Sequence, residues 1–201
     1  TTLFKSGSRK SVTNYRGVAI LPSISKVFES IVCNVLTKEV RKHISEFQHG
    51  FISGRSTSSN LMVFANYARN VMESGFQVDC IYTDFSKAFD RVQHDVLIAK
   101  LSKLGIHSSL LKWLSSYLTG RSQRVKIRGH TSRLIHVRSG VPQGSHLGPL
   151  LFLLFINDVV KVFKFSHCLL FADDLKIFMK VRNRMDALRL QMDLNRLVHW
   201  C

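Results

Sequence analysis

Acidic residues are scarce in this chain of 201 residues, which carries 13 Asp and Glu against 29 Lys and Arg. The resulting formal net charge of +16 is unusual for a soluble domain that meets no polyanion. Nucleic acid is therefore the first candidate partner, and an anionic membrane surface is the second. Because 45% of the residues are hydrophobic, the chain can still bury the core of one domain or of one lobe of a larger enzyme.

Cysteine is also sparse, and its four copies show no metal-binding pattern. None of them forms a C-x-x-C pair, and no Cys/His cluster has zinc-finger spacing. We therefore expect buried or incidental thiols in a reducing compartment, and no zinc site.

No apolar run is long enough to cross a membrane. The longest run, from Leu147 to Ile156, is interrupted by glycine and proline and is shorter than the about 20 apolar residues that a spanning helix needs. The first residues, from Thr1 to Lys5, lack the charged start and the apolar stretch of a signal peptide. Since the chain lacks an initial Met and stops at Cys201 within an expected helix, we expect a piece of a longer polypeptide.

The hydrophobic pattern predicts helices and strands in irregular alternation, without an internal repeat. Helical patterns cover residues 22–44, 57–73, 95–104, 109–118, 150–162 and 184–201. A strand pattern covers residues 78–85, and hairpin patterns cover 123–137 and 168–180. The lack of a phosphate-binding glycine fingerprint argues against a doubly wound sheet. We therefore expect an α+β fold with a small antiparallel sheet packed on helices.

Three of the few acidic residues stand in apolar surroundings. Asp84 follows an apolar strand, and Asp173 and Asp174 are adjacent in the turn of the second hairpin. An Asp-Asp pair at a hairpin tip has an ordinary interpretation as turn chemistry. If the strand and the hairpin lie side by side, however, Asp84 and Asp173 converge at one sheet edge. Such carboxylates suit Mg²⁺, and two metal ions can stabilise the attacking and leaving oxygens of a phosphoryl displacement.

Five short segments stand out in order along the chain. They are Asn14-Tyr15-Arg16 with Ile24-Ser25-Lys26-Val27-Phe28-Glu29, Gln48-His49-Gly50-Phe51 with Gly54-Arg55-Ser56-Thr57, Tyr82 to Asp90, Ser139 to Ser145 with Leu147 to Phe152, and Phe171-Ala172-Asp173-Asp174. Together they resemble the fingers and palm motifs of reverse transcriptases from non-LTR (LINE-type) retrotransposons. One A-D-D box is weak evidence, whereas five motifs in the family's order cover nearly the whole chain.

The resemblance implies the fingers and palm of a polymerase right hand. Residues of about 1–75 would be mainly fingers, and residues of about 76–201 mainly palm with some fingers elements, with the thumb and endonuclease absent. The implied activity is RNA-directed DNA synthesis at a primer 3′-hydroxyl with two Mg²⁺ ions, for which Mn²⁺ can substitute. The implied partners are an RNA template, a DNA primer and dNTPs, without a membrane. Family members work in the nucleus and cytoplasm; the sequence indicates no oligomeric state.

The resemblance also assigns metal ligands at matching positions. Asp84 and Asp173 would be the main ligands, with the backbone carbonyl of Phe85 as a further donor. Asp174 would complete the acidic cluster, or it would serve turn geometry and hydrogen bonding instead. Asp90 lies beyond the metal motif, and we expect it to form a salt bridge or to cap a helix.

A nucleotide site is implied in the same way. Its residues would be Lys5, Arg16, Phe85, Ala88, Phe89, Gln143 and Gly144. Arg16 would hold the triphosphate, because a guanidinium donates hydrogen bonds in a fork, and Lys5 would assist it or remain a solvated charge. Ala88 would let the backbone approach the triphosphate. Phe89 would exclude a 2′-hydroxyl sterically or would simply pack in the core.

Two further interpretations stay open. Gly17 stands where the family often has proline, and His146 stands where an apolar residue is common. These departures favour a catalytically inactive nucleic-acid-binding remnant of such an element, although the intact acids argue against it. A third interpretation assigns the polymerase chemistry to a mobile-intron maturase, a telomerase or an RNA virus. Some of the basic residues between Lys87 and Arg128 would follow the template or primer backbone.

Overall fold

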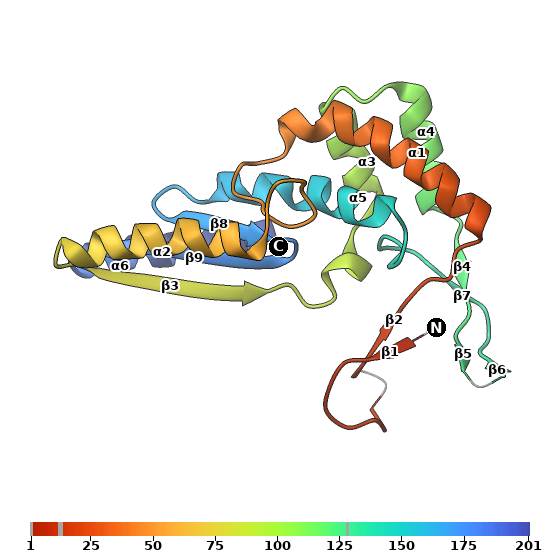
Figure 1. Cartoon of the computed structure of the whole chain (residues 1–201), viewed down its shortest axis with the longest axis horizontal. Coiled ribbons are helices and arrows are strands. Elements are labelled where there is room, and N and C mark those ends of the chain that lie inside the picture. Colours follow the sequence, from red (N-terminus) through yellow and green to blue (C-terminus); the bar gives the residue numbers. More distant parts are fainter. Residues whose placement is uncertain (1, 12–13, 128) are drawn as a thin grey trace. The chain divides into compact units, whose positions relative to one another are not determined.

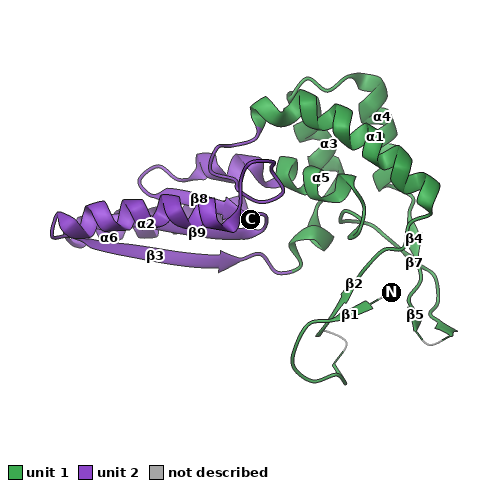
Figure 2. Cartoon of the chain, viewed as in Figure 1, with its two compact units in different colours: residues 1–43, 87–155 green, residues 44–86, 156–201 purple. Residues whose placement is uncertain are grey.

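The computed structural model describes residues 2–11, 14–127 and 129–201 (Figure 1). The chain forms two compact units, each built from two separate segments (Figure 2). Unit 1 comprises residues 1–43 and 87–155, and unit 2 comprises residues 44–86 and 156–201. Both combine helices with antiparallel strands, which confirms the predicted α+β class. The expected division at about residue 75 into fingers and palm is a functional one and stays a prediction.

Unit 2 is built on a three-stranded antiparallel sheet of order β3–β9–β8. The strands are β3 (Gln77–Asp84), β8 (His167–Phe171) and β9 (Asp174–Val181). The predicted strand and the predicted second hairpin are therefore confirmed, and they are neighbours in one sheet. Leu170, Leu175 and Ile177 are almost completely buried, so apolar side chains on these strands form the core of the unit.

Two helices pack on this sheet (Figure 1). Helix α2 (Thr57–Glu73) places the rings of Phe64 and Tyr67 at 5.2 and 4.9 Å from the ring of Phe178 in β9. Its start is fixed by a capping box between Ser56 and Ser59, which satisfies backbone amides of the first turn. Helix α6 (Arg184–Trp200) packs against β9 and ends with the ring of Trp200 near that of Phe85.

A buried carboxylate ties α6 to the loop before β8. Asp193 is 0% exposed and accepts hydrogen bonds from the backbone amides of Lys164, Phe165 and Ser166, and from the Ser166 hydroxyl. It also pairs with Arg196. Burial alone would raise the pKa of Asp193, but these hydrogen bonds outweigh it and lower the pKa.

Unit 1 is mainly helical. Its helices are α1 (Ser23–Val40), α3 (His94–Lys103), α4 (Ser108–Leu118) and α5 (Leu147–Ile156), and short 3-10 turns are η2 (Arg41–His43) and η3 (Ala88–Arg91). The helix expected over 150–162 instead begins at Leu147 and changes at Asn157 into the 3-10 turn η4 (Asn157–Val162). Within the described ranges, no helix is both long enough and apolar enough to cross a membrane.

Short antiparallel pairs complete unit 1. Strand β1 (Thr2–Phe4) pairs with β2 (Tyr15–Gly17). The predicted hairpin over 123–137 is confirmed as an interrupted ribbon, in which β4 (Ser122–Gln123) pairs with β7 (Ile135–His136) and β5 (Lys126–Ile127) pairs with β6 (His130–Thr131). Arg128, one of the basic residues expected to contact nucleic acid, lies outside the described residues.

The apolar side of α1 is largely exposed. Ile24 is 85% exposed and Ile31 is 59% exposed, whereas Leu36 and Val40 near the end of the helix are buried. Phe28 makes an edge contact with Trp113 of α4, at 5.5 Å between ring centroids. The periodic pattern therefore predicted the helix correctly, although its apolar side is buried only near the end of the helix.

Replacing Asp193 tests the link between α6 and the loop before β8. We expect Asp193→Ala to lower the free energy of unfolding by about 3 kcal/mol, because four donors lose the buried carboxylate that accepts their hydrogen bonds. The folded state lowers the pKa of Asp193, so this stabilisation is present above the unfolded-state pKa and is lost as the pH falls through the folded-state value.

The measurement is urea unfolding at neutral and acidic pH, with Glu73→Ala as the matched control. Glu73 is an exposed partner of Arg69, so its replacement should change stability by less than about 1 kcal/mol. Equal effects of the two substitutions at neutral pH would contradict the role given to Asp193.

Candidate active site

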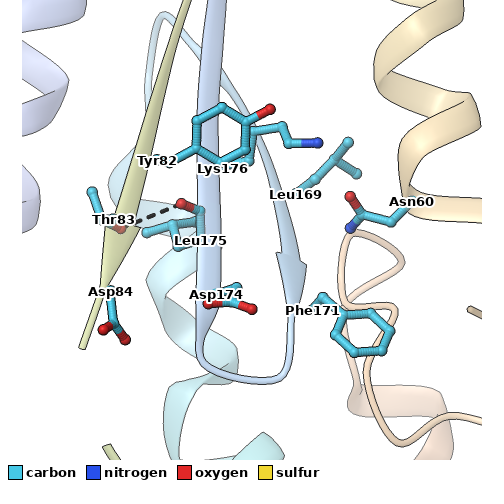
Figure 3. Close-up of a pocket in the computed structure, with 9 residues that line it drawn as sticks. All are labelled: Asn60, Tyr82, Thr83, Asp84, Leu169, Phe171, Asp174, Leu175 and Lys176. Carbon is cyan, nitrogen blue, oxygen red and sulfur yellow. Dashed lines mark hydrogen bonds between the residues drawn. The ribbon is translucent and has the colours of Figure 1, made fainter. Parts of the chain in front are cut away.

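Two of the predicted acidic residues, Asp84 and Asp174, lie at one end of the β3–β9 pair in unit 2 (Figure 3). Asp84, the last residue of β3, is the register partner of Asp174, the first residue of β9. Asp173 occupies the turn between β8 and β9. The prediction that Asp84 and Asp173 share one sheet edge is compatible with this register. The turn takes up Ala172 and Asp173, so the residue directly opposite Asp84 is Asp174.

These carboxylates act on one another electrostatically. The pKa of Asp174 is raised, first by burial and then by the negative charges of Asp173 and Asp84. Like charges on directly opposed strand residues destabilise a sheet unless a cation or a donor offsets them.

The donors have the chemistry that a hard divalent cation prefers, since all of them are carboxylate oxygens. In the described part of the chain, however, no three His, Cys, Asp or Glu side chains form a closed metal-binding group. The residues therefore fit a cation by the type of their donors and by their charge. Their roles as ligands stay predictions.

A pocket of about 410 Å³ opens beside Asp84 and Asp174 (Figure 3). Its other lining residues are Asn60, Tyr82, Thr83, Leu169, Phe171, Leu175 and Lys176. The ammonium of Lys176 lies 4.5 Å from the ring centroid of Phe64 and 5.3 Å from that of Tyr82, so two cation–π contacts hold it on this wall. The volume is sufficient for several water molecules next to the two carboxylates.

The hairpin formed by β1 and β2 in unit 1 carries the predicted phosphate-binding cations. Arg16 lies in β2 opposite Leu3, and Lys5 follows β1 directly, with its backbone amide donating to the Asn14 carbonyl at 2.8 Å. Both side chains are exposed, so both are available to a ligand.

The loop with Gln143 and Gly144 is joined to the segment that follows Arg16. The backbone amide of Ala19 donates to the carbonyl of Gln143 at 2.8 Å. Gly144 has φ +105°, and a Cβ there would lie 3.1 Å from the carbonyl oxygen of Ala19, so glycine suits both the conformation and the close approach. The structure thus brings this predicted loop next to the strand that carries Arg16.

The same loop also packs on η3, which contains Ala88 and Phe89. The amide of Val141 donates to the carbonyl of Phe89 at 2.9 Å, and the Phe89 ring stacks on Phe152 at 4.2 Å between centroids. The carboxylate of Asp90 accepts a hydrogen bond from the side-chain amide of Gln143 at 2.8 Å. Asp90 therefore holds the Gln143 amide, which corrects the expected salt bridge or helix cap.

Glu29 of α1 holds the end of this loop at His146. The sequence had not indicated this role. Glu29 is buried and accepts hydrogen bonds from the Tyr117 hydroxyl and from the backbone amide of His146, both at 3.0 Å. Burial, more than any other cause, raises the pKa of Tyr117, so its hydroxyl stays protonated as a donor. Only the backbone amide of His146 makes this contact with Glu29, and the side chain of His146 is exposed.

The predicted residues therefore form two groups. Asp84, Phe85, Asp173 and Asp174 belong to unit 2, and Lys5, Arg16, Ala88, Phe89, Gln143 and Gly144 belong to unit 1. The sequence also indicated no role for Lys176 in the pocket wall. Side chains two residues apart on a strand lie on the same face, so the position of Lys176 two residues after Asp174 was the signal that could have located it. Gln48, which hydrogen-bonds to Ala172 in the acidic turn, was missed because no local pattern links these two residues.

Comparisons of sequence identify the family of the chain. Residues 5–201 match the family described as reverse transcriptase (RNA-dependent DNA polymerase). The chain is 35% identical over 150 residues to the RNA-directed DNA polymerase from mobile element jockey of Drosophila melanogaster, covering 74% of the chain and 16% of that protein. It is 32% identical over 202 residues to the "Probable RNA-directed DNA polymerase from transposon BS" of the same species, covering 96% of the chain and 22% of that protein.

Solved structures show the same fold. The telomerase of Candida tropicalis in complex with a TWJ fragment of telomeric RNA superposes with a TM-score of 0.57 at 12% identity, over 89% of this chain and 32% of that one. The apo telomerase of the same species, truncated from its C-terminal domain, gives a TM-score of 0.55 at 14% identity, over 86% and 36% of the two chains. The predicted fingers-and-palm fold of a polymerase right hand is thus confirmed. With a family match over nearly its whole length, the chain belongs to the reverse transcriptase (RNA-dependent DNA polymerase) family and is similar to its members from non-LTR retrotransposons.

Proposed function

We propose that this chain is the fingers-and-palm part of an RNA-directed DNA polymerase of a non-LTR retrotransposon, which adds deoxynucleotides to a primer 3′-hydroxyl. The observation that carries this proposal is the pairing of Asp84 with Asp174 beside Asp173, within a chain of net charge +16. The chain spans only 16% to 22% of the lengths of the relatives named above, so the activity belongs to the larger protein.

Asp84, Asp173 and Asp174 are the residues that would hold divalent ions, with the carbonyl of Phe85 as a further donor. Two Mg²⁺ ions, or Mn²⁺ in their place, supply charge stabilisation for the attacking and leaving oxygens. The task of the carboxylates is to remain ionised at one sheet edge. Burial, and after it the charges of Asp173 and Asp84, oppose this by raising the pKa of Asp174, and a bound cation would lower that pKa again.

The nucleotide would be oriented by unit 1. Arg16 would donate to phosphate oxygens, with Lys5 as a second cation, and Ala88 leaves the backbone of η3 open to close approach. Gln143 and Gly144 would line the sugar and base. The hydrogen bond from Gln143 to Asp90 and the contact of Gly144 with Ala19 restrict the motion of this loop, and such preorganisation is how polymerases of this chemistry gain rate.

An RNA template and a DNA primer are the partners that the charge distribution favours. From Val96 to Asn157 the chain contains no acidic residue, whereas lysines and arginines recur from Lys100 to Arg138, including those of the β4–β7 and β5–β6 ribbon. Contacts of such residues with phosphates make binding strongly dependent on salt. We extend the proposal to a life cycle in which the protein works in the cytoplasm and nucleus, on the basis of its family.

Primer extension on an RNA template tests the proposed activity. The chain would be joined to the segment that follows it in a related polymerase, and Asp173→Asn should lower the rate of Mg²⁺-dependent DNA synthesis by about 1,000-fold, because a ligand charge is lost where charge develops. The matched control is Asp79→Asn, on β3 but away from the turn, which should retain the rate of the unaltered protein.

Synthesis by Asp173→Asn at the unaltered rate would contradict the assignment. RNA binding by a folded protein without any synthesis would instead favour the alternative, a catalytically inactive nucleic-acid-binding remnant.

Phe89 provides a separate test of substrate choice. If its ring excludes a 2′-hydroxyl, Phe89→Val should raise incorporation of ribonucleotides relative to deoxynucleotides by about 10-fold to 100-fold, because the clash is removed. The measurement is the ratio of kcat/KM for the two nucleotides. The control is Phe152→Val, which removes the stacked neighbour of Phe89 and should lower stability without opening the site to the same extent. A ratio that is unchanged in Phe89→Val would leave only a packing role for this ring.

A further inference from the structure

The turn that carries Asp173 and Asp174 begins with a strained residue. Ala172 has φ +55°, in the left-handed region where a Cβ crowds the following carbonyl, at a cost of about 1–2 kcal/mol. Such a conformation persists only when the surrounding structure holds it. The residue is also buried, so its backbone amide and carbonyl both need partners within the protein.

Both partners are supplied by one side chain. The Ala172 amide donates to Oε1 of Gln48 at 2.9 Å, and Nε2 of Gln48 donates to the Ala172 carbonyl at 3.2 Å. Gln48 lies 124 positions earlier in the chain and is only 3% exposed. A carboxamide places a donor and an acceptor side by side in one plane, so among side chains of this length only glutamine can make this pair of bonds without a buried charge.

Gln48 is itself fixed in place. Its Oε1 also accepts from the Gly50 amide at 2.8 Å, and its backbone carbonyl accepts from the guanidinium of Arg55 at 2.6 Å. The amide of His49 donates to the Leu170 carbonyl at 2.8 Å, which aligns this segment with β8. The second predicted motif therefore forms a rigid support for the turn.

Gly50 shows how close this support lies. A Cβ at this position would be 2.2 Å from the backbone nitrogen of Ala172, so any other residue would displace the turn or the segment. Gly50 does not have a positive φ in this structure, so the requirement for glycine here is one of space.

From this geometry we infer that Gln48 is a positioning residue, which holds Ala172 in its left-handed conformation and thereby fixes Asp173 and Asp174 for metal binding. This inference rests on the proposed polymerase function. Gln48 touches neither substrate nor metal and acts through the backbone of the turn. Supporting residues behind metal ligands commonly change activity or metal affinity by about 10-fold to 100-fold.

The test uses Gln48→Met, which keeps the length and loses all three side-chain hydrogen bonds, two to Ala172 and one to Gly50. In the extension assay described above, we expect kcat to fall by about 10-fold to 100-fold and the Mg²⁺ concentration for half-maximal rate to rise, while the KM for dNTP changes less than about twofold. Gln191→Met, at an exposed position of α6, is the matched control and should behave as the unaltered protein.

A second variant separates positioning from folding. Glycine adopts positive φ without the Cβ penalty, so Ala172→Gly added to Gln48→Met should recover at least about tenfold of the lost rate. A purely structural role for Gln48 would give no such recovery. Unaltered kcat and Mg²⁺ dependence in Gln48→Met would overturn the inference, and so would a loss of rate that Ala172→Gly does not relieve in a folded protein.

Hydrogen exchange gives a readout that does not depend on activity. The amide of Ala172 should exchange at least tenfold faster in Gln48→Met than in the unaltered protein or Gln191→Met, because its acceptor is removed. An unchanged exchange rate would contradict the claim that the clamp, the two hydrogen bonds between Gln48 and Ala172, holds the turn. If the unaltered protein extended no primer while Ala172 still exchanged faster in Gln48→Met, then the polymerase proposal would have failed and the clamp would stand.

Discussion

The candidate site depends on the register in which β3 pairs with β9. Asp84 faces Asp174 only because the residues before it pair in order, from Gln77 with Val181 onward. A slip of one residue would turn Asp84 to the opposite face of the sheet. Burial of Leu175 and Ile177 makes such a slip costly, since it would expose both side chains. The apolar core of unit 2 therefore determines where the charged groups meet.

Other parts of unit 2 offset the cost of this arrangement. Three acidic residues at one strand end repel one another, and Ala172 between β8 and Asp173 is strained. The support comes from residues far away in sequence, namely Gln48 at the turn and Asn60 at the carbonyl of Leu170. Among the described non-glycine residues, positive φ occurs at Phe51, Lys87 and Ala172, and each lies in one of the family motifs. Strain that gathers at such positions is typical of functional sites.

The sequence predicted most of the elements because their signals are local. The strand before Asp84, the hairpin around Asp173 and the helix over 57–73 each have a period that a short window reveals. The chemistry of the acids raised the approach of the strand to the hairpin as a condition, which the order β3–β9–β8 fulfils. The residue that lies directly opposite Asp84 could not be predicted, because it depends on how many residues the turn between β8 and β9 contains.

Contacts between distant segments explain the remaining differences. No local pattern shows that Gln48 lies beside Ala172, or that the Glu29 carboxylate holds the backbone of His146. The apolar residues of α1 do recur with helical spacing. Such spacing does not show which part of a helix is buried, and most of this apolar face is exposed. Asp90 was expected to form a salt bridge or to cap a helix, whereas its partner is the side chain of Gln143 in a loop more than fifty residues later.

Binding of Mn²⁺ to this chain is a direct measure of the proposed metal site, because it needs neither primer nor template. Free Mn²⁺ gives an electron paramagnetic resonance signal that is lost on binding, and Mg²⁺ can be added as a competitor. The account predicts binding that Mg²⁺ displaces and that Asp84→Asn weakens at least tenfold, while Asp79→Asn leaves it unchanged. Equal Mn²⁺ binding by the unaltered chain and by Asp84→Asn would contradict the claim that the end of the β3–β9 pair is a metal site.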